Sequence, residues 1–185
     1  MFFRAITPLL PLIPIGLVVV AVAISALGTF RRRRGRPARD AFVSAALDVL
    51  LGASILSVLL LTLLPSIDAG RSTELIPFHR GFRRSATNAE MAANMVLFVP
   101  LGAFAPARWP VLDGWGRVLL GALAFSGTIE ILQFVLALGR QASTTDVILN
   151  VAGAALGYLG LLAVRGAVGV DGRRGRSSAS RPGRT

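Results

Sequence analysis

The chain has 185 residues, of which 54% are hydrophobic and only 16% are charged. It has no cysteine and one histidine, and all of its 20 basic residues are arginine. This composition excludes disulfides, thiolate nucleophiles, Schiff-base chemistry and metal sites built from Cys or several His, and it places the chain among membrane proteins. We therefore expect no metal and no cofactor.

Five apolar blocks have about the 20 residues that a helix needs to cross some 30 Å of hydrocarbon. They are Pro14–Phe30, Ala41–Leu64, Met91–Ala107, Val118–Leu138 and Val147–Val164. The sequence thus predicts an all-α, polytopic transmembrane helical bundle with about five spanning helices. We expect a signal-anchor helix and basic cytoplasmic linker over residues 1–40, a four-helix transmembrane domain over 41–166, and a disordered basic cytoplasmic tail over 167–185.

The arginines are divided unequally between the loops. If the five helices alternate in direction, 14 of the 20 arginines lie on one side of the membrane and six on the other. The positive-inside rule then predicts a multi-pass protein of the cell membrane with its N-terminus outside and its C-terminus in the cytoplasm. The net charge of +11 is explained by this topology and by attraction to anionic lipid. No nucleic-acid partner is expected.

The basic linker and the second span come first along the chain. The arginines from Arg31 to Arg39 follow the first span directly, which is typical of a cytoplasmic stop-transfer flank rather than of a nucleic-acid patch. Asp48 lies about two turns into the second span if that helix starts near Ala41. We expect it to pair with Arg39 or with another arginine at the level of the lipid headgroups.

The connection between the second and third spans is polar and lies outside on this topology. It contains an apolar island that includes Pro77 and Phe78, followed by Arg80. Such an island packs on the bundle or lies in the membrane interface. The arginine suits a phosphate or carboxylate group of a ligand or lipid.

The third span is expected to lie in the interior of the bundle. Asn94 and Phe98 share one face of it at positions i and i+4, and Pro100 follows. A proline here is expected to kink the helix and to free backbone groups within the membrane. Those groups need partners from neighbouring helices.

The fourth span carries one polar stripe. Ser126, Glu130 and Gln133 are spaced at i, i+4 and i+7, so all three face the same side of the helix. An ionised Glu130 is too costly to face lipid without a partner. It must meet an arginine, be protonated or line a wet cavity.

The turn after this span carries Arg140, and the fifth span then begins with polar residues. Ser143 and Asp146 form a capping-box pattern, which gives Asp146 a structural interpretation beside a functional one. A single face of the fifth span then holds Asp146, Asn150, Gly153 and Gly157. The two glycines form a GxxxG motif, at which two helices approach closely within one bundle or in a homo-oligomer.

The polar residues of three spans converge in depth on this topology. They all fall in the outer half of the membrane, beneath the loops that carry Arg80 and Arg140. They are Asn94, Glu130, Gln133, Asp146 and Asn150. The sequence therefore predicts an extracytoplasmic pocket with an arginine rim, suited to a ligand with a phosphate or carboxylate head and an apolar tail.

These same segments resemble the VanZ-like membrane protein family, named after a protein of glycopeptide-resistance clusters. The resemblance rests on Leu75–Phe78, Asn94–Gly102, Ile129–Gln133, and Arg140 followed by Asp146–Gly157. It implies a small polytopic envelope protein, and in one branch of the family an association with antibiotic resistance through lowered sensitivity to teicoplanin. It carries no biochemical mechanism.

Four functions stay open at this point. The leading one is an envelope protein that binds a membrane lipid or a lipid-linked cell-wall precursor and so affects glycopeptide sensitivity. A second is a membrane enzyme for a lipid-linked or phosphate-bearing substrate, with Glu130 as general acid or base. In it, Asp146 and Asn94 orient a substrate or metal, and Arg140 neutralises a phosphate. A third is a proton-coupled lipid transporter with Glu130 as the protonatable group. In the fourth, the polar residues only hydrogen-bond one another across helices.

Overall fold

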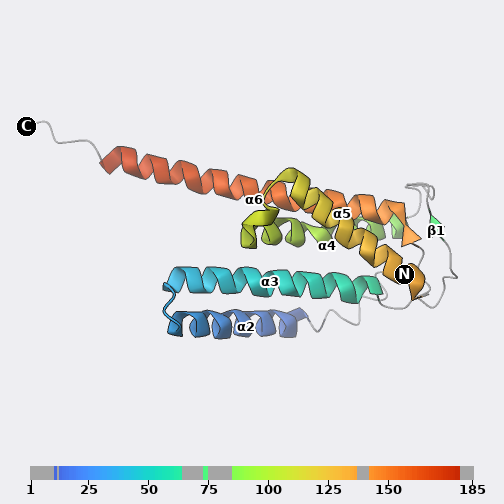
Figure 1. The fold of residues 1–185 in the computed structure, drawn as a ribbon, viewed down its shortest axis with the longest axis horizontal. Coiled ribbons are helices and arrows are strands. Elements are labelled where there is room, and N and C mark those ends of the chain that lie inside the picture. The colour runs from blue at the N-terminus through green and yellow to red at the C-terminus, as the bar shows by residue number, and fades with distance from the viewer. Residues whose placement is uncertain (1–10, 12, 64–72, 75–84, 137–141, 180–185) are drawn as a thin grey trace, which may run out of the picture.

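The structure, a computed structural model, describes residues 11, 13–63, 73–74, 85–136 and 142–179. The described part is dominated by long helices (Figure 1): α2 (Ile13–Arg33), α3 (Ala38–Leu63), α4 (Ser85–Arg108), α5 (Trp115–Val135) and α6 (Thr144–Ala179). A short 3-10 helix, η2 (Pro110–Leu112), connects α4 to α5. Five helices in the described ranges are long and apolar enough to cross a membrane. This confirms the predicted all-α transmembrane bundle.

The candidate spans agree with the predicted apolar blocks to within about one helical turn at each end. They are Ile13–Arg33, Ala38–Leu63, Met91–Arg108, Trp115–Val135 and Thr144–Val168. Helix α6 continues beyond its span to Ala179. It therefore passes residue 167, where the sequence predicts a disordered tail to begin.

A short parallel strand pair joins two of the connections. Strand β1 (Thr73–Glu74) belongs to the connection between α3 and α4, and strand β2 (Ala142–Ser143) immediately precedes α6. Thr73 lies opposite Ala142 and Glu74 opposite Ser143. The pair ties these two connections together at one end of the bundle (Figure 1).

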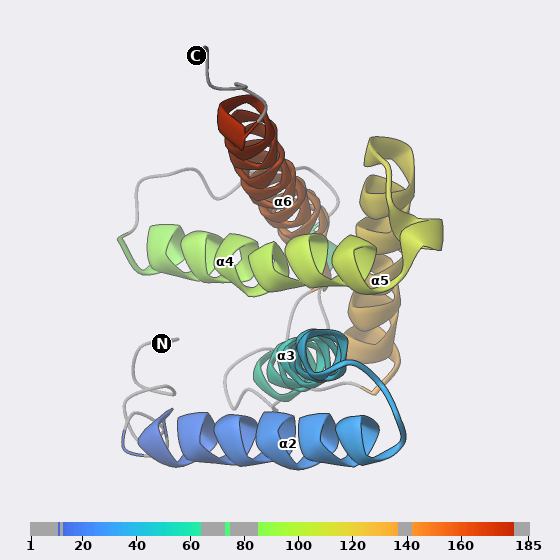
Figure 2. The ribbon, with the colours of Figure 1, turned by 90° about the vertical axis from the view of Figure 1, so that its left-hand side faces the viewer.

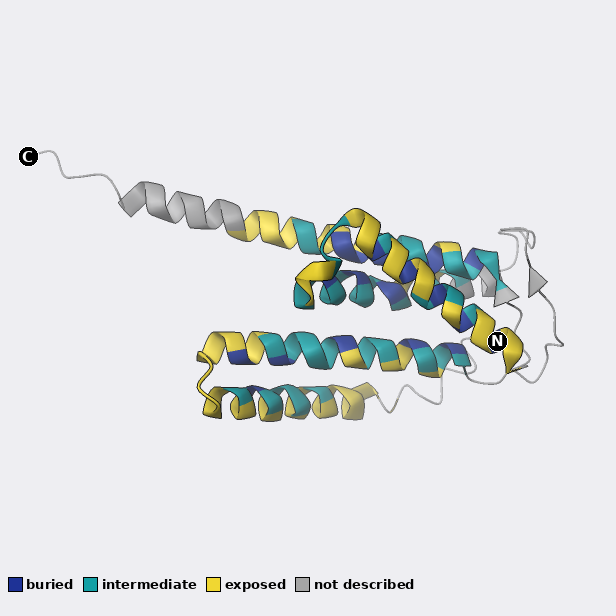
Figure 3. Ribbon diagram, viewed as in Figure 1, coloured by how far each residue is buried: buried dark blue, intermediate teal, exposed yellow. Residues whose placement is uncertain are grey.

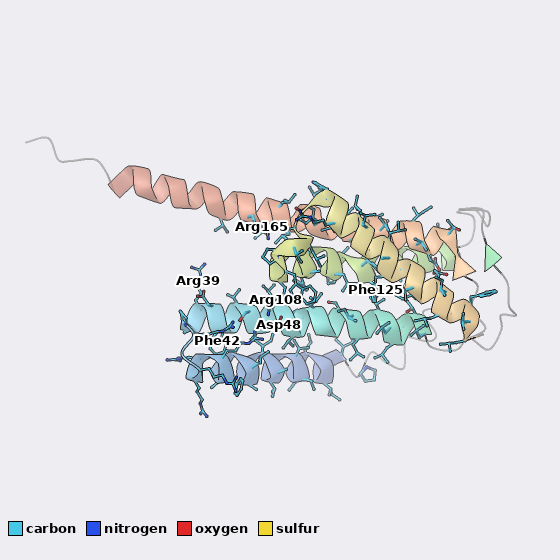
Figure 4. The ribbon with its side chains drawn as sticks, viewed as in Figure 1. Arg39, Phe42, Asp48, Arg108, Phe125 and Arg165 are labelled. Carbon is cyan, nitrogen blue, oxygen red and sulfur yellow. The ribbon has the colours of Figure 1, made fainter. Side chains whose placement is uncertain are left out.

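The bundle has two ends that differ in chemistry. The arginine-rich end holds the turn between α2 and α3, η2 and Arg165 of α6 (Figures 1 and 4). The Glu130 end holds the last turns of α3 and α5, the β1–β2 pair and the start of α6 (Figure 1). Helix α2 lies at the edge of the bundle, against α3 and on the far side of it from α4 and α6 (Figure 2). Helix α4 is interior, as predicted, because it packs between α3 and α6. Pro100, where the sequence predicts a kink, lies inside this helix.

The core lies where α3, α4, α5 and α6 meet. Val58, Phe98, Ile129 and Tyr158 contribute one buried side chain from each of these helices. The ring of Phe98 also packs against that of Phe125, with centroids 5.8 Å apart. Exposed residues cover much of α2 and the outer faces of the other helices (Figure 3), and many of them are large aliphatics. Such a surface suits lipid rather than water.

Helices α4 and α6 approach so closely that glycine is required along their seam. A Cβ on Gly153 would lie 2.0 Å from the carbonyl oxygen of Met95, and one on Gly157 would lie 1.9 Å from that of Val99. Gly102 of α4 approaches the backbone of α6 equally closely. The close approach that the GxxxG motif predicts is thus made to α4 of the same chain. A homo-oligomer through Gly153 and Gly157 would first require α4 to move away.

Candidate functional site

Glu130 connects the end of α5 to the start of α6. It is half-buried, and its Oε2 accepts a hydrogen bond from the backbone N–H of Ser143 at 2.7 Å. Ser143 directly precedes the first residue of α6, so its N–H is one of the donors that a helix N-terminus leaves without an intrahelical partner. The carboxylate of Glu130 therefore fixes the position at which α6 begins.

The hydrogen bond to Glu130 differs from the local capping pattern. In a capping box, the N–H of Ser143 would bond to the carboxylate of Asp146. Its acceptor in the structure is instead a residue of another helix. Asp146 is half-buried in the first turn of α6. The carboxylates of Glu130 on α5 and Asp146 on α6 thus both lie at the start of α6.

Gln133 caps the end of α3. Its side chain is only 5% exposed, and its Nε2 donates to the carbonyl oxygen of Thr62 at 2.7 Å. Thr62 is in the last turn of α3, where backbone carbonyls have no intrahelical partner. This contact gives Gln133 a structural role at the Glu130 end.

Asn150 has a similar role between α5 and α6. Its Nδ2 donates to Oγ of Ser126 at 2.8 Å, and both residues are buried. Ser126 lies one turn from Glu130 on the same face of α5. The stripe Ser126, Glu130 and Gln133 therefore reaches three different segments: α6, β2 and α3.

Asn94 lies beside this network without joining it. It is half-buried, one turn from Phe98 on the same face of α4, and that face points into the core beside Phe125 of α5. Its side chain makes no hydrogen bond within the part of the chain that the structure describes. Asn94 thus lies toward the Glu130 end with an amide group that forms no hydrogen bond to the described residues.

The remaining predicted site residues, Pro77, Phe78, Arg80 and Arg140, lie outside the described residues. The β1–β2 pair belongs to the same two connections. In the sequence, Pro77 follows Glu74 of β1 by three residues, and Arg140 precedes Ala142 of β2 by two. Across the described ranges, no group of three or more His, Asp or Glu is arranged to hold a metal ion.

The arginine-rich end contains a charge cluster around Asp48. Its Oδ2 accepts a bond from Nη2 of Arg31 at 2.5 Å, and its Oδ1 accepts one from Nε of Arg108. Nη1 of Arg31 also donates to Oγ of Ser44 at 3.0 Å. An arginine partner for Asp48 is confirmed, but Arg39 is not that partner. Figure 4 shows Arg39 pointing away from the bundle while Arg108 and Asp48 face each other.

A second cluster at this end surrounds Asp113, which lies between two spans. Its Oδ1 accepts a bond from the hydroxyl of Tyr158 at 2.9 Å, and its Oδ2 accepts one from Nη1 of Arg165 at 2.8 Å. The hydroxyl and then the guanidinium hold the pKa of the Asp113 carboxyl below its usual value. The stabilisation from these contacts is therefore present above the pKa of the unfolded carboxyl and is lost as the pH falls through the lowered pKa.

The Asp113 cluster was not predicted from the sequence. Its signal was the spacing of Tyr158 and Arg165 at i and i+7, which places both on one face of α6. Tyr158 is the single tyrosine in the chain. The ring of Trp115 packs edge-on against it at 5.0 Å. The cluster joins α6 to the turn between α4 and α5 and so supports the bundle at its arginine-rich end.

Comparison with known protein families gives one relevant match. A family model described as VanZ/LLP1 matches residues 50–165. This range begins within α3, contains α4 and α5, and ends at Arg165 of α6, so it covers the core and excludes α2. No match was found among curated proteins or among solved structures.

Proposed function

Since this chain belongs to the VanZ/LLP1 family of membrane proteins, we propose that it is an envelope protein that binds an amphiphilic ligand at the Glu130 end. The ligand is a membrane lipid or a lipid-linked cell-wall precursor with a phosphate or carboxylate head. The Glu130 end faces outward and the arginine-rich end faces the cytoplasm, in agreement with the positive-inside rule.

The observation that carries this proposal is the contact between Glu130 and the N–H of Ser143. It brings a carboxylate from a membrane-spanning helix to the point where the connections before α4 and before α6 pair as strands. Carboxylates within spans are costly and mark functional sites. Asp146 in the first turn of α6 could itself accept the N–H of Ser143. Capping of α6 alone therefore does not require an acid on α5.

We assign seven of the predicted residues to ligand contact and two to support of the helices. Arg80 and Arg140 recognise the anionic head, because guanidinium groups bind phosphate and carboxylate through paired N–H donors. Asn94, Glu130 and Asp146 form the polar floor, and Pro77 and Phe78 contact the apolar tail. The remaining two, Gln133 and Asn150, hold the helices under the site through their bonds to Thr62 and Ser126.

An effect on glycopeptide antibiotics such as teicoplanin follows from this function when the ligand is a cell-wall precursor. Binding would then change how much precursor is available outside the membrane. Ligand binding is thus the proposed function, and resistance would follow only when the ligand is a cell-wall precursor.

Substitution of Arg140 tests head recognition. We expect Arg140→Ala to weaken binding of a polyprenyl monophosphate about 10- to 100-fold, the loss that corresponds to one hydrogen-bonded contact with a charged group. Native mass spectrometry of the detergent-purified protein, titrated with this lipid, measures the change. Arg39→Ala removes an exposed arginine at the other end and should leave binding unaltered. Equal binding by wild type and Arg140→Ala would contradict the proposal.

The companion variant Glu130→Gln separates binding from catalysis and proton transport. A glutamine oxygen can still accept the N–H of Ser143, so the start of α6 is retained, but the side chain can no longer exchange a proton. If Glu130→Gln retains both lipid binding and the cellular phenotype, the general acid or base and the proton carrier are both excluded. Retained binding with loss of the phenotype would instead favour the enzyme or the transporter.

A further inference from the structure

An apolar cavity lies in the half of the bundle next to the arginine-rich end. It is a partly enclosed cavity of about 170 Å³. Its walls are apolar and come from α3, α4, α5 and α6, including Leu51 and Ile55 of α3, Phe98 of α4, Phe125 of α5 and Ala154 of α6. The space exists because α3 packs along α4 while α5 packs mainly along α6. A gap therefore remains between α3 and α5 beside α4, on the side of α5 that carries Phe125 (Figure 4).

The mouth of this cavity combines an interfacial aromatic residue with a positive charge. Trp109, Leu112 and Arg117 line it at the arginine-rich end. Trp109 is 44% exposed, and tryptophan is enriched where a membrane protein meets the headgroup region. The walls thus lead from the membrane interface into an apolar interior.

Arg117 is exposed at the mouth of the cavity. Its Nη1 donates to the backbone oxygen of Asp113 at 3.2 Å, which holds the side chain in place. The carboxylate of Asp113 is bound to Tyr158 and Arg165 instead. Among the described residues, Arg117 forms no salt bridge. A guanidinium has five N–H donors, so it can bind an anionic oxygen as well as the backbone.

Shape and charge together identify the occupant. An apolar cavity of about 150 Å³ is large enough to hold a benzene-sized hydrocarbon and stays dry, and in a bilayer the abundant hydrocarbon is the acyl chain. The neighbouring segment from Arg31 to Arg39 holds six arginines, which attracts anionic lipid to this end. We propose that the cavity binds one anionic phospholipid, with a few methylenes of one acyl chain between α3 and α5 and its phosphate on Arg117. This site is separate from the one at the Glu130 end.

Tryptophan quenching by brominated lipid tests this proposal. The chain has two tryptophans, so Trp115→Phe leaves Trp109 at the cavity mouth as the single fluorophore. The protein is reconstituted in vesicles that contain phosphatidylglycerol or phosphatidylcholine with brominated acyl chains. We expect the brominated phosphatidylglycerol to quench Trp109 at an about fivefold lower mole fraction, the ratio for one arginine–anion contact at a membrane surface.

Two pairs of variants in the Trp115→Phe background assign the effect to the cavity. Arg117→Gln should abolish the preference for phosphatidylglycerol, whereas Arg39→Gln should retain it. Gly121→Leu should reduce quenching, because Gly121 lines the cavity and an added Cβ there meets nothing within 4 Å. Gly116→Leu, on the same helix, has equally open space but does not line the cavity, and it should not reduce quenching.

Three results would overturn the proposal. One is equal quenching by the two lipids, and another is a preference that survives Arg117→Gln. The third is stronger quenching by phosphatidylcholine, which would assign the cavity to a zwitterionic lipid.

Discussion

Gly157→Ala is expected to destabilise the protein far more than Gly160→Ala, although both replace a glycine of α6. A Cβ at position 157 would lie 1.9 Å from the carbonyl oxygen of Val99, whereas one at position 160 would meet nothing within 4 Å. A backbone oxygen cannot rotate away, so α4 and α6 must separate. Overpacking costs about 1–3 kcal/mol or more. The gain in helix stability from Gly to Ala, about 0.5–1 kcal/mol, applies at both positions.

The unfolding temperatures of the two purified variants in detergent measure this difference. Gly160→Ala should unfold at or above the temperature of the wild type, and Gly157→Ala well below it. Similar unfolding temperatures for both variants would show that α4 and α6 are not in backbone contact at Val99.

Asp48→Asn should loosen the attachment of α2 to the bundle. Asp48 binds Arg31 of α2 and Arg108 of α4, and its side chain is 25% exposed. Removing one member of a fully buried ion pair costs about 3–5 kcal/mol, whereas an exposed pair contributes about 0–1 kcal/mol. For this partly exposed cluster we expect Asp48→Asn to lower the free energy of unfolding by an intermediate amount, about 1–3 kcal/mol.

Hydrogen exchange of backbone amides measures where this loss appears. Helix α2 packs along α3 and is bound to Asp48 through Arg31. The backbone amides of α2 should therefore exchange faster in Asp48→Asn than in the wild type. Asp40→Asn is the control. Asp40 is exposed in the first turn of α3, the helix that also carries Asp48. It has no salt bridge within the described residues. Equal exchange in the two variants would contradict a role for Asp48 in holding α2.

Much of the fold could be predicted because a bilayer constrains it strongly. Each span needs an apolar run of sufficient length, and the runs in this sequence are separated by clear polar connections. The stripe of Ser126, Glu130 and Gln133 could also be predicted, because positions i, i+4 and i+7 share a helix face whatever the helix packs against. The structure turns two members of this stripe, Ser126 and Gln133, into the bundle.

The partners of these residues could not be predicted, because they depend on the rotation and register of one helix against another. Each residue added to a helix rotates the side chains after it by about 100° around the helix axis. The choice of Arg31 over Arg39 by Asp48 depends on the turn between α2 and α3, where Gly35 has a φ of 87° that favours glycine. The bond from Ser143 to Glu130 rather than to Asp146 is likewise a long-range contact that a local capping pattern does not contain.

The proposed outer-leaflet site depends most directly on which side of the membrane the Glu130 end faces. Because the chain has no cysteine, single cysteines can be introduced at position 140, beside β2, and at position 36, in the turn between α2 and α3. A membrane-impermeant maleimide is then applied to right-side-out vesicles before and after permeabilisation. We expect Arg140→Cys to be labelled in sealed vesicles and Arg36→Cys only after permeabilisation. Labelling of position 36 in sealed vesicles, with position 140 protected until permeabilisation, would contradict an outward-facing ligand site.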